Sequence, residues 1–213
     1  MALQPLRWTH EQLWPPRLPG PPRPPGGPRV IVAGIDPSLT GTGIGIIDNG
    51  TIIAHTRIGF PGRDGASDID RARRVVAIVL DVRKFISRFN PDMVIIESPA
   101  YGQYLPSTCD RNFLWGTLVH DYGVAQKRAY ASVTPTCRAQ FATGKGHAPK
   151  QAVVDAVNTW WPHLNLKPKQ DNEADGIVLA TMGAARYEPD QLPFALAEWQ
   201  RNNVNAVAWP VMP

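Results

Sequence analysis

The sequence predicts an α/β fold in which a mixed sheet is flanked by helices. Two observations support this fold class. Short continuous apolar runs, typical of buried strands, occur early in the chain. Longer segments follow in which apolar residues recur three and four positions apart, the spacing of an amphipathic helix. Because strands and helices then alternate, we expect helices on both faces of the sheet.

Five strands are expected. The first three follow one another directly, at residues 30–35, 42–47 and 51–58. Asn49-Gly50, between the second and the third, is a strong signal for a tight hairpin turn, so these two strands should be antiparallel. The last two strands are shorter apolar runs, at residues 93–96 and 130–133.

Four helices complete the pattern. The first, at residues 69–89, is expected to end at Asn90-Pro91, because proline disfavours a helical conformation in the residue before it. The other three helices are expected at residues 111–120, 150–161 and 173–187. Together the predicted elements define one folded domain at residues 30–188.

The two ends of the chain differ from this domain. Nine of the 22 prolines fall between Pro5 and Pro28, so residues 1–29 should form an extended, disordered arm. Residues 189–213 carry few structural signals and are interpreted as a C-terminal tail. The arm also holds most of the formal net charge of +4, which leaves the folded part nearly neutral.

Composition excludes several classes of protein. Hydrophobic residues make up 43% of the 213-residue chain and charged residues 19%, a globular balance with no run long enough to cross a membrane. Cys109 and Cys137 are too few for a disulfide framework or a zinc site. We therefore expect reduced thiols in a cytoplasmic protein.

Carboxylates follow two of the predicted core strands. Asp36 and Glu97 each come directly after a buried apolar run, and open α/β sheets place their sites at such strand ends. A third acidic group begins the last helix, where Asp171 or Asn172 could share a helix face with Asp175.

Clustered carboxylates raise one another's pKa and call for a cation. Oxygen ligands without Cys or His select hard ions, here Mg²⁺ or Mn²⁺. Two such ions roughly 3.5–4 Å apart can promote phosphodiester hydrolysis. Taken singly, each acid has an ordinary explanation, since Asp36 could belong to a turn, Glu97 to a solvated strand end and Asp171 to a helix cap. All three groups together favour a metal site.

Four segments of the chain resemble the RuvC-type Holliday junction resolvases, phage or bacterial enzymes of the RNase H-like superfamily. The segments are GIDPSLTGTGIGII, VIIESPAYG, ATGKGHAPKQAVVDAV and DNEADGIVLA, and the resemblance covers about residues 30–187. It implies an RNase H-like fold with a five-stranded sheet in the order 3-2-1-4-5. It also implies two Mg²⁺ ions per active site, with Asp36 bridging both ions and Glu97 and Asp175 holding one each.

The family's fourth ligand, an acid or histidine three residues before the last aspartate, falls on Asn172, which is a departure. Asp171 is the alternative. Lys150 matches a basic residue that the family uses near DNA, and Arg138 stands beside the position of its partner.

The span between Asp121 and Asp155 contains no acidic residue, which favours a DNA-binding surface that includes Lys145 as well as Lys150 and Arg138. Tyr101 and Tyr104 lie in a loop after Glu97 and are candidates for stacking on bases at an opened junction. Phe113 and Trp115 are interpreted as core residues.

We therefore predict a Mg²⁺-dependent endonuclease that resolves Holliday junctions or other branched DNA. A homodimer is expected, because resolution needs two opposed cuts in a substrate with two-fold symmetry. The alternatives are a related nuclease acting on flaps, forks or RNA–DNA hybrids, and a junction-binding protein without catalysis. An actin-like ATPase would need a second phosphate loop and a longer chain.

Overall fold

The structure is a computed structural model that describes residues 29–99 and 106–212. Its sheet has five strands in the order β3-β2-β1-β4-β5, which confirms the fold class and the strand order that the resemblance implies. The strands are β1 (Ile31–Asp36), β2 (Thr42–Asp48), β3 (Thr51–Ile58), β4 (Met93–Glu97) and β5 (Ala129–Val133). β2 pairs antiparallel with β1 and β3, whereas β4 pairs parallel with β1 and β5.

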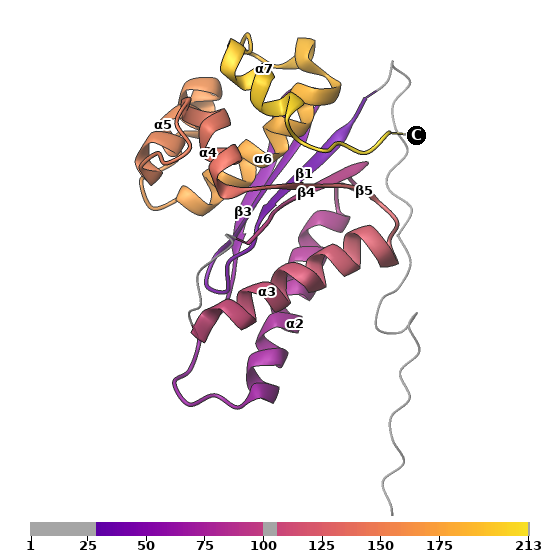
Figure 1. Cartoon of the computed structure of the whole chain (residues 1–213), viewed down its shortest axis with the longest axis vertical. Helices are drawn as coiled ribbons and strands as arrows, with labels where there is room; N and C mark the ends of the chain where they lie inside the picture. The colour runs from indigo at the N-terminus through magenta and orange to yellow at the C-terminus, as the bar shows by residue number, and fades with distance from the viewer. Residues whose placement is uncertain (1–28, 100–105, 213) are drawn as a thin grey trace, which may run out of the picture.

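Helices cover both faces of this sheet (Figure 1). One face carries α2 (Asp68–Ser87) and α3 (Pro106–Val119), and a π-helical turn, η1 (His120–Ala125), extends α3. The other face carries α4 (Pro135–Thr143), α5 (Lys150–Trp160), α6 (Asp171–Tyr187) and α7 (Glu198–Asn205). Two short 3-10 turns, η2 (Pro162–Leu164) and η3 (Pro189–Gln191), connect elements on this second face.

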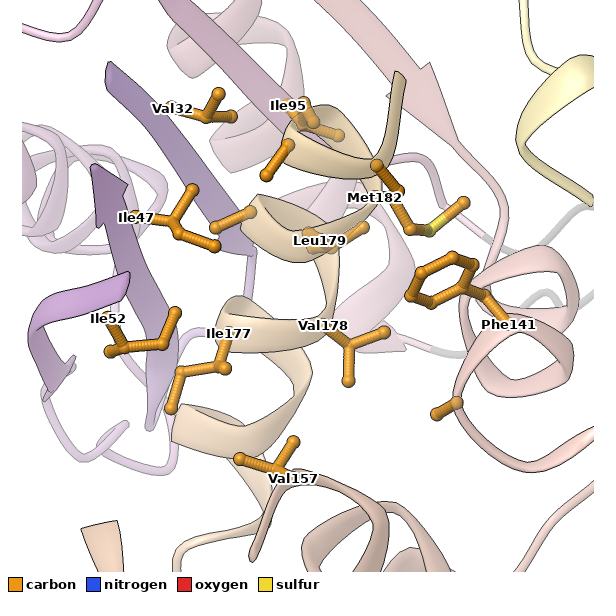
Figure 2. Packing of buried hydrophobic residues seen from close by; sticks show 14 of the residues in the cluster. Val32, Ile47, Ile52, Ile95, Phe141, Val157, Ile177, Val178, Leu179 and Met182 are labelled. Carbon is orange, nitrogen blue, oxygen red and sulfur yellow. The ribbon is translucent and has the colours of Figure 1, made fainter. Parts of the chain in front are cut away.

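Alternation along the strands separates two apolar cores. In β1, Val32 belongs to the core under α6, whereas Ala33 and Ile35 belong to the core under α2 and α3. Figure 2 shows the first of these cores, in which Ile177 and Leu179 of α6 face the strand residues. The buried apolar runs of the sequence thus become strands covered on both sides.

Helix α6 approaches the sheet unusually closely because glycines line the contact. A Cβ atom on Gly43 of β2 would lie 1.6 Å from the backbone oxygen of Asn172. One on Gly34 of β1 would lie 2.2 Å from the oxygen of Gly176. No side chain fits at either position, so the first turns of α6 rest directly on the backbone of β1 and β2. This contact fixes where the acidic start of α6 lies.

Three elements differ from the sequence prediction. Helix α3 begins at Pro106, five residues before the predicted start, because proline is favoured in the first turn of a helix. Helix α4 was not predicted, although Thr134 caps it by accepting a hydrogen bond from the backbone of Cys137. Helix α7 lies in the segment interpreted as a tail, and Leu192 and Val204 of that segment belong to the core.

The proline-rich arm, apart from residue 29, lies outside the described residues. In the described ranges, none of the helices has the length and apolar character that a membrane crossing requires.

Candidate active site

Asp36 and Glu97 end two neighbouring parallel strands. The register pairs Ile35 of β1 with Ile96 of β4, so the next residue of each strand is an acid at the same edge of the sheet. Glu97 is 9% exposed. The prediction that the two carboxylates emerge side by side is therefore correct, and its cause is the parallel pairing.

The start of α6 brings further oxygen ligands to this edge. Asn172 and Asp175 lie three residues apart on the helix, and both line a cleft of about 290 Å³ together with Asp36 and Glu97. Asp175 is only 6% exposed. Because α6 is held against Gly43, its first turn cannot withdraw from the strand ends without losing that contact.

Arg138 reaches into the middle of this carboxylate group. It lies one turn inside α4, the helix that follows β5 directly, and β5 pairs with β4 so that Val133 stands opposite Glu97. Its guanidinium donates from Nε to Glu97 and from Nη1 to Asp175. The side chain is 11% exposed. The sequence predicted Arg138 as part of the DNA-binding surface. In the structure it contacts Glu97 and Asp175 instead.

The acids carry raised pKa values. The pKa of Glu97 is raised to about 8, chiefly by burial and also by the neighbouring Asp36, while Arg138 opposes the shift. Burial likewise raises the pKa of Asp175 to about 7, against the lowering effect of Arg138. The pKa of Asp36 is raised by burial, again opposed by Arg138. Burial and mutual repulsion disfavour the charged form of these carboxylates, and a bound cation would offset both effects.

Asp171 and Lys150 form a separate pair at the mouth of the site. Lys150 Nζ donates to Asp171 Oδ2, and the Lys150 side chain is 75% exposed. Asp171 does not cap α6, since Gln170 occupies the N-cap position. Among the described residues that line the cleft, Asn172 is present and Asp171 is not.

The donor set fits a hard metal ion in its chemistry, because it consists of carboxylate and amide oxygens only. In the described parts of the chain, however, no group of three acidic, His or Cys side chains is arranged to hold a metal. The Arg138 guanidinium contacts both Glu97 and Asp175, two of the acids from which a metal site would be built.

The other predicted DNA contacts are dispersed. Lys145 is exposed in the loop between α4 and α5, near Lys150 at the start of α5. Arg128, another basic residue of the span between Asp121 and Asp155, is buried and donates to the Pro91 carbonyl at the opposite end of the sheet, so it does not extend the basic surface. Tyr101 and Tyr104 lie outside the described residues.

Helix α3 supplies a wall of the cleft that sequence reasoning missed. Thr108, Arg111, Asn112 and Trp115 line it. Trp115 is partly buried as expected, but Phe113 is 47% exposed, so its interpretation as a core residue was wrong. The sequence order could have indicated this wall, because the helix that follows β4 in the chain is expected near the end of β4, where Glu97 lies.

The sheet order, with helices on both faces and acids at the strand ends, is the architecture of an RNase H-like fold. A sequence model of the family described as "Crossover junction endodeoxyribonuclease RuvC" matches residues 32–182. The chain therefore belongs to the RuvC family, whose nucleases are metal-dependent in general.

Individual relatives agree with this assignment. A crossover junction endodeoxyribonuclease RuvC from Bifidobacterium longum subsp. infantis is 32% identical over 166 residues, covering 74% of this chain and 80% of that protein. One from Prochlorococcus marinus is also 32% identical, covering 71% of this chain and 96% of the other. The structure of T. thermophilus RuvC in complex with a Holliday junction substrate superimposes with a TM-score of 0.58 at 22% identity, over 76% of this chain and 97% of that chain, which supports the fold.

Proposed function

We propose that this RuvC-family chain resolves Holliday junctions, or other branched DNA, in the cytoplasm by hydrolysing phosphodiester bonds with two Mg²⁺ ions per active site. Mn²⁺ should substitute, because it accepts the same oxygen ligands. The observation that carries the proposal is the convergence of Asp36, Glu97 and Asp175 from two strands and a helix on one cleft.

The positions of the residues around the cleft suggest which would hold metal ions and which would bind phosphate. Asp36 at the end of the central strand β1, Glu97 at the end of β4 and Asp175 on α6 would hold the ions. When bound, such ions activate the attacking water and stabilise the leaving oxygen. Lys150 at the mouth of the cleft would neutralise a backbone phosphate and keep the scissile bond in reach of the acids.

Asn172 is proposed as the fourth ligand. Its position three residues before Asp175 and its place in the cleft support this role, while Lys150 already engages Asp171. An amide oxygen can coordinate Mg²⁺ but adds no charge. The site would thus hold its ions with fewer negative charges than a site with a fourth acid.

DNA would cross the cleft mouth over Lys145, Lys150 and the start of α4 that carries Arg138, with Tyr101 or Tyr104 stacking on opened bases. A homodimer would present two such sites to the two opposed strands of a junction, which has the same two-fold symmetry. Light scattering of the protein, free and on a junction, tests the dimer. A monomer in both states would point instead to a fork or flap nuclease.

The test of the function compares cleavage of a four-way junction, a fork and a linear duplex in Mg²⁺, Mn²⁺ or EDTA. We expect junction nicking in both metals and none in EDTA. Asp36→Asn should abolish cleavage and retain junction binding, because the amide removes ligand charge but no part of the basic surface. Asp81→Asn, an exposed change on α2, is the matched control and should cleave normally.

Two results would contradict the proposal. If the protein cleaves forks, flaps or RNA–DNA hybrids in preference to junctions, the proposed substrate is wrong. If the wild-type chain binds junctions tightly but nicks them in neither metal, it is a junction-binding protein without catalysis.

A further inference from the structure

We propose that Arg138 is an internal counter-ion of the metal-free site, which leaves the carboxylates for a DNA phosphate as divalent ions bind, so that metal loading is coupled to substrate binding. The inference rests on the proposed function, because it assigns a role in the same cleft. Its basis is the position of the guanidinium between Glu97 and Asp175.

The two ion pairs are buried. The side chains of Arg138, Glu97 and Asp175 are 11%, 10% and 8% exposed, so water screens their charges little. Among the described residues, Arg138 forms the ion pairs with Glu97 and Asp175. Lys150 instead pairs with Asp171. Removing this guanidinium would take away the positive charge that the two buried acids contact, so their charged forms would lose their counter-ion.

A metal ion and the guanidinium compete for the same oxygens. Arg138 contacts Glu97 through one nitrogen and Asp175 through another, and these two acids come from β4 and α6 and line the same cleft. A divalent ion shared by those acids would occupy the space of the guanidinium and would repel it. Arginine does not lose its proton in proteins, so the site can be cleared only by movement of the side chain.

A phosphate offers the displaced side chain a new partner. Arg138 lines the cleft together with Lys150 and Arg111, and its planar set of donors matches the oxygens of a phosphate. DNA in the cleft would therefore release the acids, and metal on the acids would release Arg138 for DNA. By linkage, each ligand should increase the affinity for the other by the same factor.

The first experiment measures Mn²⁺ binding to the free full-length protein by electron paramagnetic resonance. Arg138→Met removes the charge while keeping an unbranched apolar stem. Lys150→Met is the matched control, because it removes one positive charge near the same acids but from the Asp171 pair. We expect Arg138→Met to bind Mn²⁺ about tenfold more tightly than wild type and clearly more tightly than Lys150→Met.

The second experiment measures the coupling. Junction affinity is determined by fluorescence anisotropy in EDTA and in Ca²⁺, an oxygen-liganded ion of the same charge. For wild type, Ca²⁺ should tighten junction binding by about tenfold, and for Arg138→Met this ratio should fall close to one.

If Arg138→Met is unstable without metal, thermal unfolding provides the readout. Mn²⁺ should then raise the melting temperature more for Arg138→Met than for wild type. Equal gains in Mn²⁺ affinity, or in Mn²⁺-induced stability, for Arg138→Met and Lys150→Met would overturn the proposal, because they would reflect general electrostatics. Absence of junction binding by wild type would count against the proposed function alone, since the Mn²⁺ measurements need no DNA.

Discussion

The raised pKa of Glu97 predicts that the metal-free protein loses stability as the pH rises. The pKa of this carboxyl is raised from 4.5 to about 8 in the folded state, chiefly by burial. Between those two values the folded protein holds a proton that the unfolded chain has released. The free energy of unfolding therefore falls with increasing pH, by at most about 1.4 kcal/mol per pH unit for one such group. From pH 5.5 to 7.5 the loss would be on the order of 2–3 kcal/mol.

Glu97→Gln isolates this contribution. The amide keeps the shape and can still accept a hydrogen bond from Arg138 Nε, but it does not titrate. Urea unfolding in EDTA, followed by tryptophan fluorescence at pH 5.5, 6.5 and 7.5, should give a steeper loss for wild type than for Glu97→Gln. Mg²⁺ should restore more stability to wild type at pH 7.5 than at pH 5.5, because its ligands must be deprotonated. Parallel pH dependences of the two proteins would refute the reasoning.

Three further outcomes are expected. Asn172→Ala should lower the cleavage rate, whereas Asp171→Asn should cleave nearly as wild type, and a folded but inactive Asp171→Asn protein would reverse that assignment. Gly43→Ala should destabilise the fold by about 1–3 kcal/mol, because its Cβ would meet α6, while Gly116→Ala, with open space around its Cβ, should be neutral or stabilising. Equal melting temperatures of the two alanine variants would contradict the close helix–sheet contact. Lys145→Ala should reduce the log–log salt slope of junction binding by about 0.9, and an unchanged slope would place the phosphates elsewhere.

The strand ends of the site could be predicted because local signals agree there. Asp36 and Glu97 each follow an apolar run that must be buried, and the parallel pairing of β1 and β4 brings the two ends together. The start of α6 was predicted within two residues because its alanine-rich sequence favours a helix. The sequence pattern could not predict how closely α6 approaches the sheet. That distance depends on glycines of separate elements that meet only in the folded structure.

Helix α7 was missed for a different reason. Two of its three buried residues are polar, namely Gln200 and Asn203. Gln200 Nε2 donates to the carbonyl of Phe141, and Asn203 accepts from the thiol of Cys137. Because the helix docks through specific hydrogen bonds as well as Val204, its sequence lacks the apolar stripe by which amphipathic helices are found.

The orientation of Arg138 could not be read from the sequence either. A basic residue in a span without acids favours a solvated or DNA-facing position, and the acids that it meets are 41 and 37 residues distant in the chain. Only the adjacency of β5 to β4 carries the start of α4 to Glu97. Charge patterns along the sequence therefore identify the members of the site but not their pairing.

Anchored acids beside long cationic side chains would allow one backbone to serve both the metal-free and the metal-bound state of the site. Asp36 and Glu97 are short side chains on strands, and Asp175 is a short side chain on a helix that is packed against glycine backbone, so their oxygens are held in place. Arg138 and Lys150 are long side chains with several rotatable bonds, and they can exchange a carboxylate for a phosphate without movement of the backbone. With an uncharged Asn172 in the cleft, the internal cations have one negative charge fewer to balance than a fourth acid would impose. As a ligand, Asn172 would also hold a metal ion less tightly than an acid, and metal loading would then depend more on the release of Arg138 by DNA.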